Sequence, residues 1–279
     1  MKMNGKLYIV ATPIGNLEDI TLRALRILKD VDIIAAEDTR QTLKLLNHFE
    51  ISKPLMSYHR HNEEIKSNIL IEKLKKGNNI ALVSDAGTPG ICDPGEEIIK
   101  KSIEEQIEVI PIPGPCAMVN ALIASGVDTK EFCFLGFLPL NKKLRKEKIE
   151  EIKNAEKTII IYEAPHKMKN TLGDLKDILK DRKVVLAREL TKVHEEFIRK
   201  DIEELLAIVD NLKGEMILII EGIKKKNNVE NKLNNLTLEE HYKYYENQGI
   251  DKKEIIKKIA KDRNVNKNDI YMKFVKDKK

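Results

Sequence analysis

The stretch Ala81-Leu-Val-Ser-Asp-Ala-Gly-Thr-Pro-Gly-Ile-Cys-Asp-Pro-Gly95 joins a short apolar run to a loop rich in glycine and proline, and it decides the fold. The apolar run predicts a buried strand that ends at Ser84 and delivers Asp85 into the loop. In a parallel sheet, the carboxyl ends of the strands line the ligand crevice. Three glycines and two prolines exceed what one tight turn capped by Asp85 requires. We therefore predict a ligand-binding loop with Asp85 and Thr88 as polar anchors.

Similar apolar runs recur along the first 223 residues, with helical patterns between them. They are rich in Ile and Val and lack apolar/polar alternation, which is typical of strands covered on both faces, as in parallel sheets. The pattern predicts an α/β fold with two units of four or five strands that meet near Pro111–Ser125. The predicted strands are Leu7–Ala11, Asp32–Ala36, Ile80–Ser84, Ile107–Ile112, Phe132–Gly136, Thr158–Glu163, Lys183–Arg188 and Met216–Glu221.

The last part of the chain differs in composition and in charge. Residues 224–279 hold 16 Lys or Arg and 9 Asp or Glu, whereas the rest of the chain carries a net charge of −2. Three short helices are predicted there, at Leu238–Asn247, Asp251–Asp262 and Lys267–Val275. The last two resemble a helix-turn-helix in outline, as do many ordinary three-helix packings. The basic balance indicates a polyanionic partner such as nucleic acid, or else a solvated helical surface.

These boundaries predict three domains. An N-terminal α/β domain covers residues 1–115, a second α/β domain covers 116–223, and a linker with a basic three-helix domain covers 224–279. Pro111–Pro115 contains three prolines, which lack an amide donor and so fit neither a helix interior nor a central strand.

Composition excludes several classes of protein. Aromatic residues make up 5% of the chain and Trp is absent, which argues against an aromatic-rich carbohydrate or peptide platform. Apolar runs fall far short of the roughly 18 residues that a membrane span needs. The three cysteines, Cys92, Cys116 and Cys133, are odd in number and never spaced CxxC. This argues against a disulfide framework or a cysteine zinc site, and it fits a reducing cytoplasm.

Nucleotide-binding motifs are also missing. No two glycines are two residues apart, so the GxGxxG fingerprint is absent. Gly90 and Gly95 have P-loop spacing, but Glu96 stands where a lysine should meet phosphate. Polar residues do follow other predicted strands, namely Ala11–Asn16 and the charged Ala36–Arg40. In the second segment, four charged or polar residues directly after a buried strand are more than a plain helix cap requires, although a cap at Asp38 or Thr39 is the simpler interpretation.

Together these strings resemble the ribosomal RNA small-subunit methyltransferase I branch of the tetrapyrrole (corrin/porphyrin) methylase superfamily. The resemblance runs from about Leu7 to Gly222, and several unusual strings in one order make it specific. Four residues depart from the family pattern around the loop, where a bulkier apolar residue and three serines are expected: Gly90, Cys92, Cys116 and Ala164. The strings are ATPIGNLEDIT, AAEDTR, SYHRHNE, LVSDAGTPGICDPG, PIPGPCA, GFLP, YEAPHK, ARELTKVHEEF and LIIEG.

The resemblance implies two α/β domains with S-adenosylmethionine in the cleft between them, usually in a homodimer. It implies methyl transfer to the ribose 2′-hydroxyl of a cytidine in the decoding region of 16S rRNA, as free RNA or within the small subunit. Carried onto this chain, it implies these cofactor contacts: Ile14, Asp85, Gly87, Thr88, Cys116 and Ala117, with Tyr162, Glu163 and Arg188 as weaker candidates.

The reaction needs alignment and a base for a weakly acidic hydroxyl. The candidate bases are Glu37, Asp38, His59, His61, Glu189 and Glu195, and Arg40, Arg60, Arg188 and Lys192 are candidates to hold phosphates. His59 and His61 lack a third ligand at a recognisable spacing, so no metal is predicted. Two alternatives stay open, a tetrapyrrole C-methyltransferase and a non-catalytic rRNA-binding assembly factor. S-adenosylmethionine affinity separates the second from an enzyme.

Overall fold

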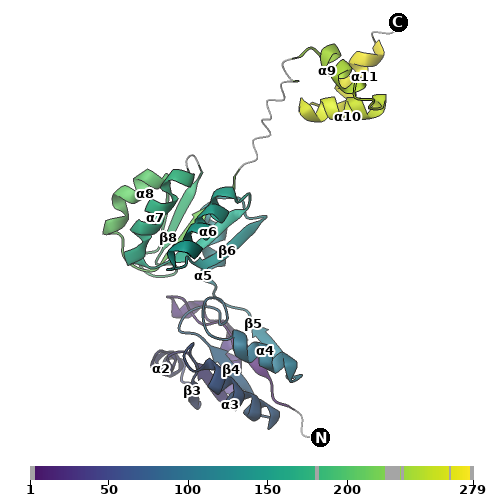
Figure 1. Ribbon diagram of the computed structural model, residues 1–279. Helices are drawn as coiled ribbons and strands as arrows, with labels where there is room; N and C mark the ends of the chain where they lie inside the picture. Colours follow the sequence, from purple (N-terminus) through teal and green to yellow (C-terminus); the bar gives the residue numbers. More distant parts are fainter. Residues whose placement is uncertain (1–3, 180–181, 224–232, 234–235, 264, 277–279) are drawn as a thin grey trace. The chain divides into compact units, whose positions relative to one another are not determined.

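A computed structural model describes residues 4–179, 182–223, 233, 236–263 and 265–276. The chain forms two compact units, Met1–Ile223 and Lys224–Lys279 (Figure 1). The larger unit contains two five-stranded sheets, and the smaller unit is helical. Most of the predicted linker lies outside the described residues, and the predicted limits of the three domains stay predictions. None of the helices in the described ranges is long and apolar enough to cross a membrane.

The first sheet is entirely parallel, with the order β3-β2-β4-β1-β5. Its strands are β1 (Leu7–Val10), β2 (Ile33–Ala36), β3 (Leu55–Ser57), β4 (Ile80–Val83) and β5 (Val109–Ile112). Four of them match predicted strands closely, whereas β3 was not predicted because three residues are too few for a pattern. Pro111 lies in β5, and β5 tolerates it because it is an edge strand.

Helices cover both faces of this sheet. They are α1 (Leu22–Asp30), α2 (Thr39–His48), α3 (Glu63–Lys75) and α4 (Glu96–Glu104), and the 3-10 turn η1 (Leu17–Asp19) precedes α1. Leu28 of α1 and Leu46 of α2 belong to one buried cluster with Val10. Leu70 of α3 and Ile98 of α4 belong to another cluster. Because both faces are covered, the strands carry the unbroken apolar runs seen in the sequence.

The second sheet has the order β6-β7-β10-β8-β9, and only β6 and β7 are parallel. Its strands are β6 (Phe132–Phe137), β7 (Thr158–Glu163), β8 (Val184–Arg188), β9 (Glu196–Lys200) and β10 (Met216–Ile220). The prediction of a parallel sheet from unbroken apolar runs was therefore wrong here. Helices cover both faces of this sheet as well, so antiparallel central strands lose their apolar/polar alternation. The exposed edge strand β9 was not predicted at all.

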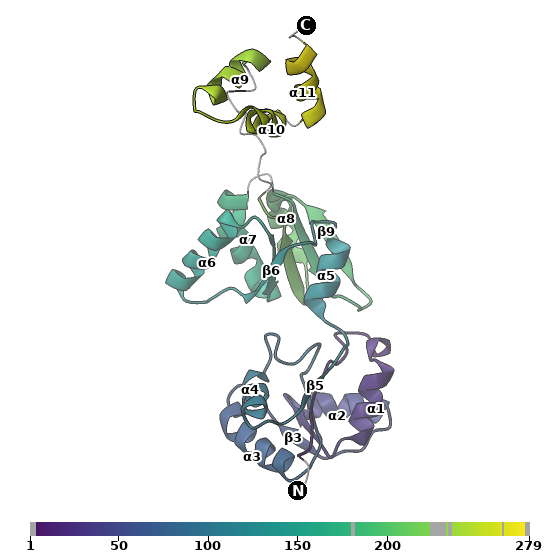
Figure 2. The same cartoon turned by 90° about the vertical axis from the view of Figure 1, so that its right-hand side faces the viewer.

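The covering helices of the second sheet are α5 (Ala117–Ser125) on one face and α6 (Lys142–Asn154), α7 (Pro165–Leu179) and α8 (Ile202–Ile208) on the other (Figure 2). A 3-10 turn, η2 (Val209–Asn211), follows α8. The register pairs Met216 at the start of β10 with both Glu163 and Arg188. The carboxyl ends of β7 and β8 and the amino end of β10 thus lie at the same end of the sheet. Ile14, from the loop after β1, joins the α5-side cluster and connects the two sheets.

The smaller unit consists of α9 (Leu238–Glu246), α10 (Lys252–Asp262) and α11 (Lys267–Lys276), as predicted to within about two residues. Its core contains Ile255, Ile259 and Ile270. His241 is completely buried, and its Nε2 lies 3.2 Å from a carboxylate oxygen of Asp262. The Arg263 guanidinium donates a hydrogen bond to Nδ1 of the same ring. This short helical unit therefore has its own apolar core and its own buried polar network.

Candidate active site

The loops after β1 and β4 are joined at the carboxyl edge of the first sheet. The amide of Thr12 donates to the carbonyl of Gly87 at 2.8 Å, and the amide of Gly87 donates back at 3.0 Å. The Thr88 hydroxyl donates to the carbonyl of Pro115 at 3.0 Å, which ties the same loop to the entry of α5. The predicted ligand loop is thus held on two sides.

Gly87 occupies a position that other residues cannot adopt easily. Its φ is +83°, and a Cβ atom there would lie 3.2 Å from Cγ2 of Ile14. A side chain would therefore strain the backbone and press on a residue of the cavity wall. This constraint explains why glycine follows Asp85-Ala86 in the sequence.

The loop after β2 is joined to Asp85. A carboxylate oxygen of Asp85 accepts a hydrogen bond from the amide of Asp38 at 2.9 Å. The Asp38 carboxylate caps α2 by accepting from the amide of Arg40 at 2.8 Å, and it also forms an ion pair with the Arg40 side chain. The hydrogen bonds from Arg40 lower the pKa of Asp38 to about 2. The simpler interpretation, a helix cap at Asp38, describes what this residue does here.

A cavity of about 440 Å³ lies between these loops and the edge of the second sheet. Nine of the predicted site residues line it, namely Ile14, Glu37, Asp85, Gly87, Thr88, Cys116, Ala117, Tyr162 and Glu163. Five carboxylates line it in total, because Asp93 and Glu215 join Glu37, Asp85 and Glu163. Among the described residues that line the cavity, none is Lys, Arg or His. The cavity is therefore suited to a ligand that carries positive charge.

Two of these carboxyls have raised pKa values. Burial raises the pKa of Asp93 to about 6, and the negative charge of Glu37 adds to the shift. Burial likewise raises the pKa of Glu37, with the charge of Asp85 as the second cause. Because Glu37 follows β2 and Asp93 follows β4, the fold brings together carboxyls from two separate loops. Partly desolvated carboxyls of this kind are better proton acceptors than exposed ones.

Tyr162 and Glu163 are held at the end of β7. The Tyr162 hydroxyl accepts a hydrogen bond from the amide of Met118 at 2.9 Å, and its ring contacts Phe134 and Phe137 edge-on. Glu163 is nearly buried and accepts from the Ala164 amide and the Thr171 hydroxyl at 2.9 and 2.6 Å. Tyr162 therefore fixes the start of α5 against β7, and Glu163 holds the start of α7.

The remaining candidates lie outside the lining of this cavity. Arg188 pairs with Glu196 at 2.7 Å. Lys192 pairs with both Glu189 and Glu215 at about 3 Å. Burial of Glu189 opposes ionisation, yet hydrogen bonds from Lys192 and the Glu215 amide leave its pKa lowered. The Glu195 carboxylate accepts a hydrogen bond from the Thr191 amide.

His59, Arg60 and His61 lie between β3 and α3. The His59 ring lies 3.0 Å from the Asn62 amide nitrogen, and its other nitrogen is buried with no hydrogen-bond partner among the described residues. The Arg60 guanidinium donates to the carbonyl of Cys92 in the glycine-rich loop. Within the described ranges, no group of three or more His, Cys, Asp or Glu side chains is placed to hold a metal ion.

Four residues that line the cavity were not predicted from the sequence. Asp93 lies in the quoted loop, but its carboxylate was not singled out. Glu215, Met216 and Ile217 precede or begin β10, whose amino end faces the cavity because β10 is antiparallel. A search confined to the carboxyl ends of parallel strands could not find them.

The departures from the family pattern lie in or beside the same cavity. Cys92, Cys116 and Ala164 line it. Gly90 has φ +80°, and a Cβ there would lie 3.7 Å from Cδ1 of Ile99, an ordinary contact. Glycine at this position therefore removes backbone strain without leaving a large gap. Cys92 itself has φ +64°, so the loop keeps a left-handed turn with a non-glycine residue.

A second cavity, of about 410 Å³, adjoins the first and shares Asp85, Ala86 and Glu215 with it. Its other lining residues are mostly polar and include Thr12, Gln41 and Lys44. The two cavities together form a site with one acidic compartment and one mixed polar compartment, separated by Asp85 and Glu215.

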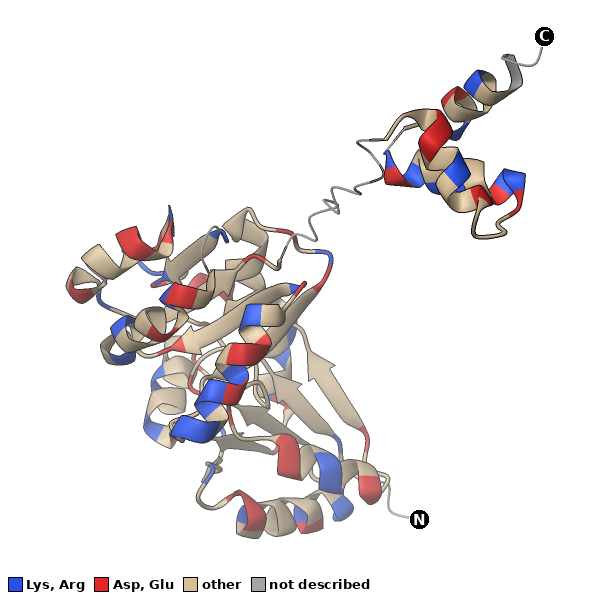
Figure 3. Ribbon diagram, turned by 45° about the horizontal axis from the view of Figure 1, so that its top comes forward, with Lys and Arg blue, Asp and Glu red and all other residues tan. Residues whose placement is uncertain are grey.

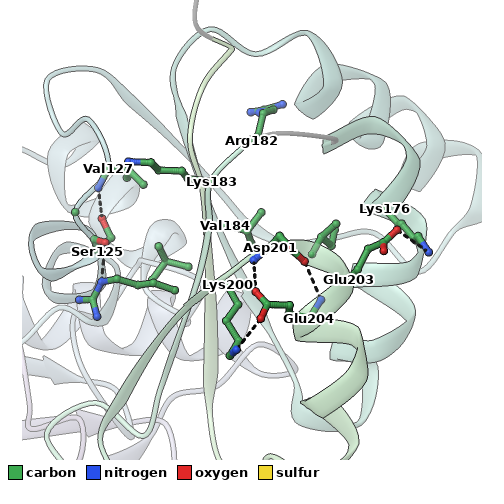
Figure 4. A pocket seen from close by; sticks show the side chains of 14 residues that line it. Ser125, Val127, Lys176, Arg182, Lys183, Val184, Lys200, Asp201, Glu203 and Glu204 are labelled. Atoms are coloured by element: carbon green, nitrogen blue, oxygen red, sulfur yellow. Dashed lines mark hydrogen bonds and ion pairs between the residues drawn. The ribbon is translucent and has the colours of Figure 1, made fainter.

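A larger cavity, of about 740 Å³, lies at the opposite edge of the second sheet, beside Val184 (Figure 4). Two of its three lysines are neutralised locally, because Lys200 pairs with Glu204 at 2.9 Å and Lys176 pairs with Glu203 at 3.2 Å. None of the residues predicted to act in the site lines this cavity. The acidic cavity, although smaller, is therefore the candidate active site.

The residues of the acidic cavity fit S-adenosylmethionine. Its sulfonium and amino groups are positively charged and match the carboxylates, and its adenosine suits the apolar wall of Ile14, Ala117 and Ile217. Gly87 leaves backbone within reach of a ligand where any side chain would intrude. The lining carboxylates can hold a cation, and none of the described lining residues is itself a cation. Such a set of residues suits a sulfonium, which is positively charged before it gives up its methyl group.

Comparison with known proteins agrees with this geometry. The profile of the Tetrapyrrole (Corrin/Porphyrin) Methylases matches residues 6–206. The chain resembles the solved uroporphyrin-III C-methyltransferase from Thermus thermophilus complexed with S-adenyl homocysteine, with a TM-score of 0.57. That likeness covers 78% of this chain and 97% of the other at 15% identity, and it establishes the fold.

Two curated relatives are much more similar over nearly the whole chain. Ribosomal RNA small subunit methyltransferase I of Halalkalibacterium halodurans is 53% identical, over 96% of this chain and 93% of the relative. The protein of the same name from Bacillus subtilis is 50% identical, over 97% and 96%. The chain therefore belongs to the tetrapyrrole methylases and, within them, to the ribosomal RNA small subunit methyltransferase I family.

Proposed function

We propose that this protein transfers a methyl group from S-adenosylmethionine to the ribose 2′-hydroxyl of a cytidine in the decoding region of 16S rRNA. The observation that carries the proposal is the cavity around the Gly87 loop, which five carboxylates line and which no Lys, Arg or His among the described residues lines. Relatives at 50–53% identity that are named ribosomal RNA methyltransferases support the choice of RNA as substrate.

The chain's own residues perform two tasks in this reaction. S-adenosylmethionine, when bound, supplies a methyl group on a positively charged sulfur. Asp85 and Asp93 provide negative charge around that cation, and the Thr12–Gly87 pairing keeps the loop in a fixed position. Fixed positions matter because orientation alone is worth up to roughly 7–11 kcal/mol of a bimolecular barrier.

Glu37 is the residue that we assign as the base for the 2′-hydroxyl proton. Of the candidate bases predicted from the sequence, it is the one that lines the acidic cavity, and its pKa is raised. Asp38 is a weaker choice because its hydrogen bonds with Arg40 lower its pKa to about 2. In this assignment the Glu37 carboxylate would accept the proton that the ribose oxygen loses as its bond to the methyl carbon forms and the methyl–sulfur bond breaks.

The acceptor nucleotide is assigned to the adjoining cavity of about 410 Å³. A methyl acceptor must meet the cofactor, and this cavity shares the Asp85 and Glu215 wall with the acidic one. Gln41 and Lys44 supply groups that can hydrogen-bond to a nucleotide, and the Lys44 ammonium already donates to the Gln41 amide oxygen at 3.2 Å.

The test is methyl transfer to a decoding-region RNA fragment, with the product located by mass spectrometry. We expect one 2′-O-methylcytidine per fragment with the wild-type protein. Glu37→Gln should lower kcat by about 100-fold, since a positioned base contributes roughly 10²–10⁴ in rate, while calorimetry shows S-adenosylmethionine affinity within a few-fold of wild type. Transfer to a tetrapyrrole and not to RNA, or RNA binding without S-adenosylmethionine binding, would select the alternative functions.

We also infer that the protein acts in the cytoplasm, where its RNA substrate is found, and that it is a homodimer. The dimer is supported by α5, which is apolar apart from Asn120 and Ser125 yet leaves Val119 and Ile123 exposed by 41% and 67%. Light scattering should give twice the mass of the chain, and Ile123→Glu should give a monomer. A monomeric wild-type protein would disprove the dimer.

The two separate sheets support the proposed domain boundary between residues 115 and 116.

A further inference from the structure

The outer side of α10 carries a row of lysines. Lys253, Lys257 and Lys261 follow one another at intervals of four residues, so they lie along one side of the helix, about 6 Å apart along its axis. All three are exposed. The opposite side of α10 holds Ile255, Ile256 and Ile259, which are buried in the core of the helical unit. We refer to Lys253, Lys257 and Lys261 as the lysine row.

The lysine row differs from several of the lysines on the helices of the larger unit. There, Lys101, Lys148 and Lys153 each pair with a glutamate three or four residues away, at 2.6–3.0 Å. Among the described residues, no ion pair involves a member of the lysine row. Figure 3 shows Lys and Arg together with Asp and Glu on the helices of both units.

An unpaired row of this kind works against folding. Like charges four residues apart in a helix are destabilising by about 0.2–0.5 kcal/mol per pair. Two acids lie on the same helix. Glu254, three residues before Lys257, is exposed and forms no ion pair among the described residues. Asp262 accepts a hydrogen bond from Tyr245 and lies against His241 inside the unit. Within the described residues, the lysine row therefore forms no ion pair that would offset the repulsion among its own charges.

We propose that the lysine row binds the phosphate backbone of the RNA substrate. Three cations in one line, spaced by one helical turn, suit a strand with regularly repeated negative charges. Binding would release counterions from the RNA and so provide sequence-independent affinity. The proposal rests on the proposed function for the identity of the RNA, and it adds a second contact region on the helical unit.

The test compares two full-length triple variants that lose the same charge. The first is K253Q/K257Q/K261Q. The control is K29Q/K76Q/K100Q, which removes three exposed lysines from α1, from the turn after α3 and from α4, none of them in a described ion pair or in the acidic cavity. RNA affinity is measured for a decoding-region fragment from about 50 to 200 mM salt. Circular dichroism checks that each variant is folded.

We expect the first variant to reduce the slope of log affinity against log salt by about 2 units, because each phosphate contact contributes about 0.7 for a single strand. The control should keep the wild-type slope. S-adenosylmethionine affinity and kcat at saturating RNA should be unchanged in both. An unchanged slope in the first variant, or an equal reduction in the control, would overturn the proposal.

The same measurements separate this proposal from the proposed function. Wild-type protein that binds the fragment but transfers no methyl group would refute the proposed function, while a slope change confined to the first variant would still support the lysine row. An equal slope change with a duplex DNA of matched length would show a general polyanion contact and would overturn RNA as the partner.

Discussion

The acidic cavity and the lysine row are opposites in charge and in exposure. The cavity gathers five carboxylates, and burial raises the pKa of Asp93 to about 6. The lysine row holds three cations in full contact with water. Charges that are exposed to water are screened by salt over about 10 Å, whereas partly buried charges are screened much less. The two regions should therefore respond to different variables, the cavity to pH and the lysine row to salt.

The difference shows which level of structure supplies the binding energy for a small cation and which supplies it for a long polyanion. A small cation needs carboxylates fixed at short range, which requires loops from separate strands to converge and costs desolvation. A long polyanion needs only cations in a line, which one helix supplies by its period. The first arrangement depends on the tertiary fold and the second on local sequence.

The largest effect should come from Gly87→Val. Its φ of +83° and the 3.2 Å approach to Ile14 leave no room for a β-branched side chain. Backbone strain of this kind costs about 1–3 kcal/mol, so we expect S-adenosylmethionine affinity to fall by about 100-fold in calorimetry. RNA affinity and its salt slope should not change, because the lysine row is untouched.

The matched control is Gly126→Val. Gly126 has a similar φ of +80°, but nothing lies within 4 Å of a Cβ there, and it does not line the acidic cavity. It should cost stability with little effect on cofactor affinity. Equal loss of affinity in the two variants would show that strain alone, and not the loop at the cavity, accounts for the result.

A smaller effect is expected from Asp93→Asn. As pH falls through about 6, Asp93 takes up a proton and the cavity loses negative charge. Wild-type S-adenosylmethionine affinity should therefore fall by up to about tenfold between pH 7.5 and 5, which corresponds to about 1.4 kcal/mol of binding free energy. In Asp93→Asn the affinity should start lower and show a flatter pH profile.

The same variant should be more stable than wild type at pH 7. The folded pKa of about 6 lies above the ordinary value of 3.8, so the fold favours the protonated form. The stability from this group is complete below about 3.8 and is lost as pH rises through about 6. Replacing Asp93 by Asn should recover about 1–2 kcal/mol at neutral pH, after discounting for its partial exposure. Thermal unfolding that shows lower stability would contradict this account.

Much of the fold could be predicted from the sequence. Eight of the ten strands in the described residues were predicted, because each leaves a mostly apolar run of four to six residues that is rich in Ile and Val except in β6. The two that were missed are β3, which is three residues long, and β9, which is an exposed edge strand. The three C-terminal helices were predicted because their apolar period and capping residues, such as Thr237 and Asp251, are local signals.

The candidate site was predicted in part for the same reason. Asp85, Gly87 and Thr88 lie in one loop whose glycines and prolines mark it, and all three line the cavity. Arg188, Glu189 and Lys192 lie near the predicted edge but do not line the cavity. Arg188 forms an ion pair with Glu196, and Lys192 forms ion pairs with Glu189 and Glu215. Sequence spacing places a residue at a strand end but cannot tell which way its side chain points.

By itself the sequence determined the elements, the glycine-rich loop, the family and the excess positive charge of the last helices, since each depends on residues close together in the chain. Only the tertiary structure decided that β10 runs antiparallel and so brings Glu215 to the cavity. Only it placed Asp93 near Glu37 and joined Asp38 to Asp85. These contacts connect residues that are dozens of positions apart, and their energies depend on burial and distance, which a linear pattern does not contain.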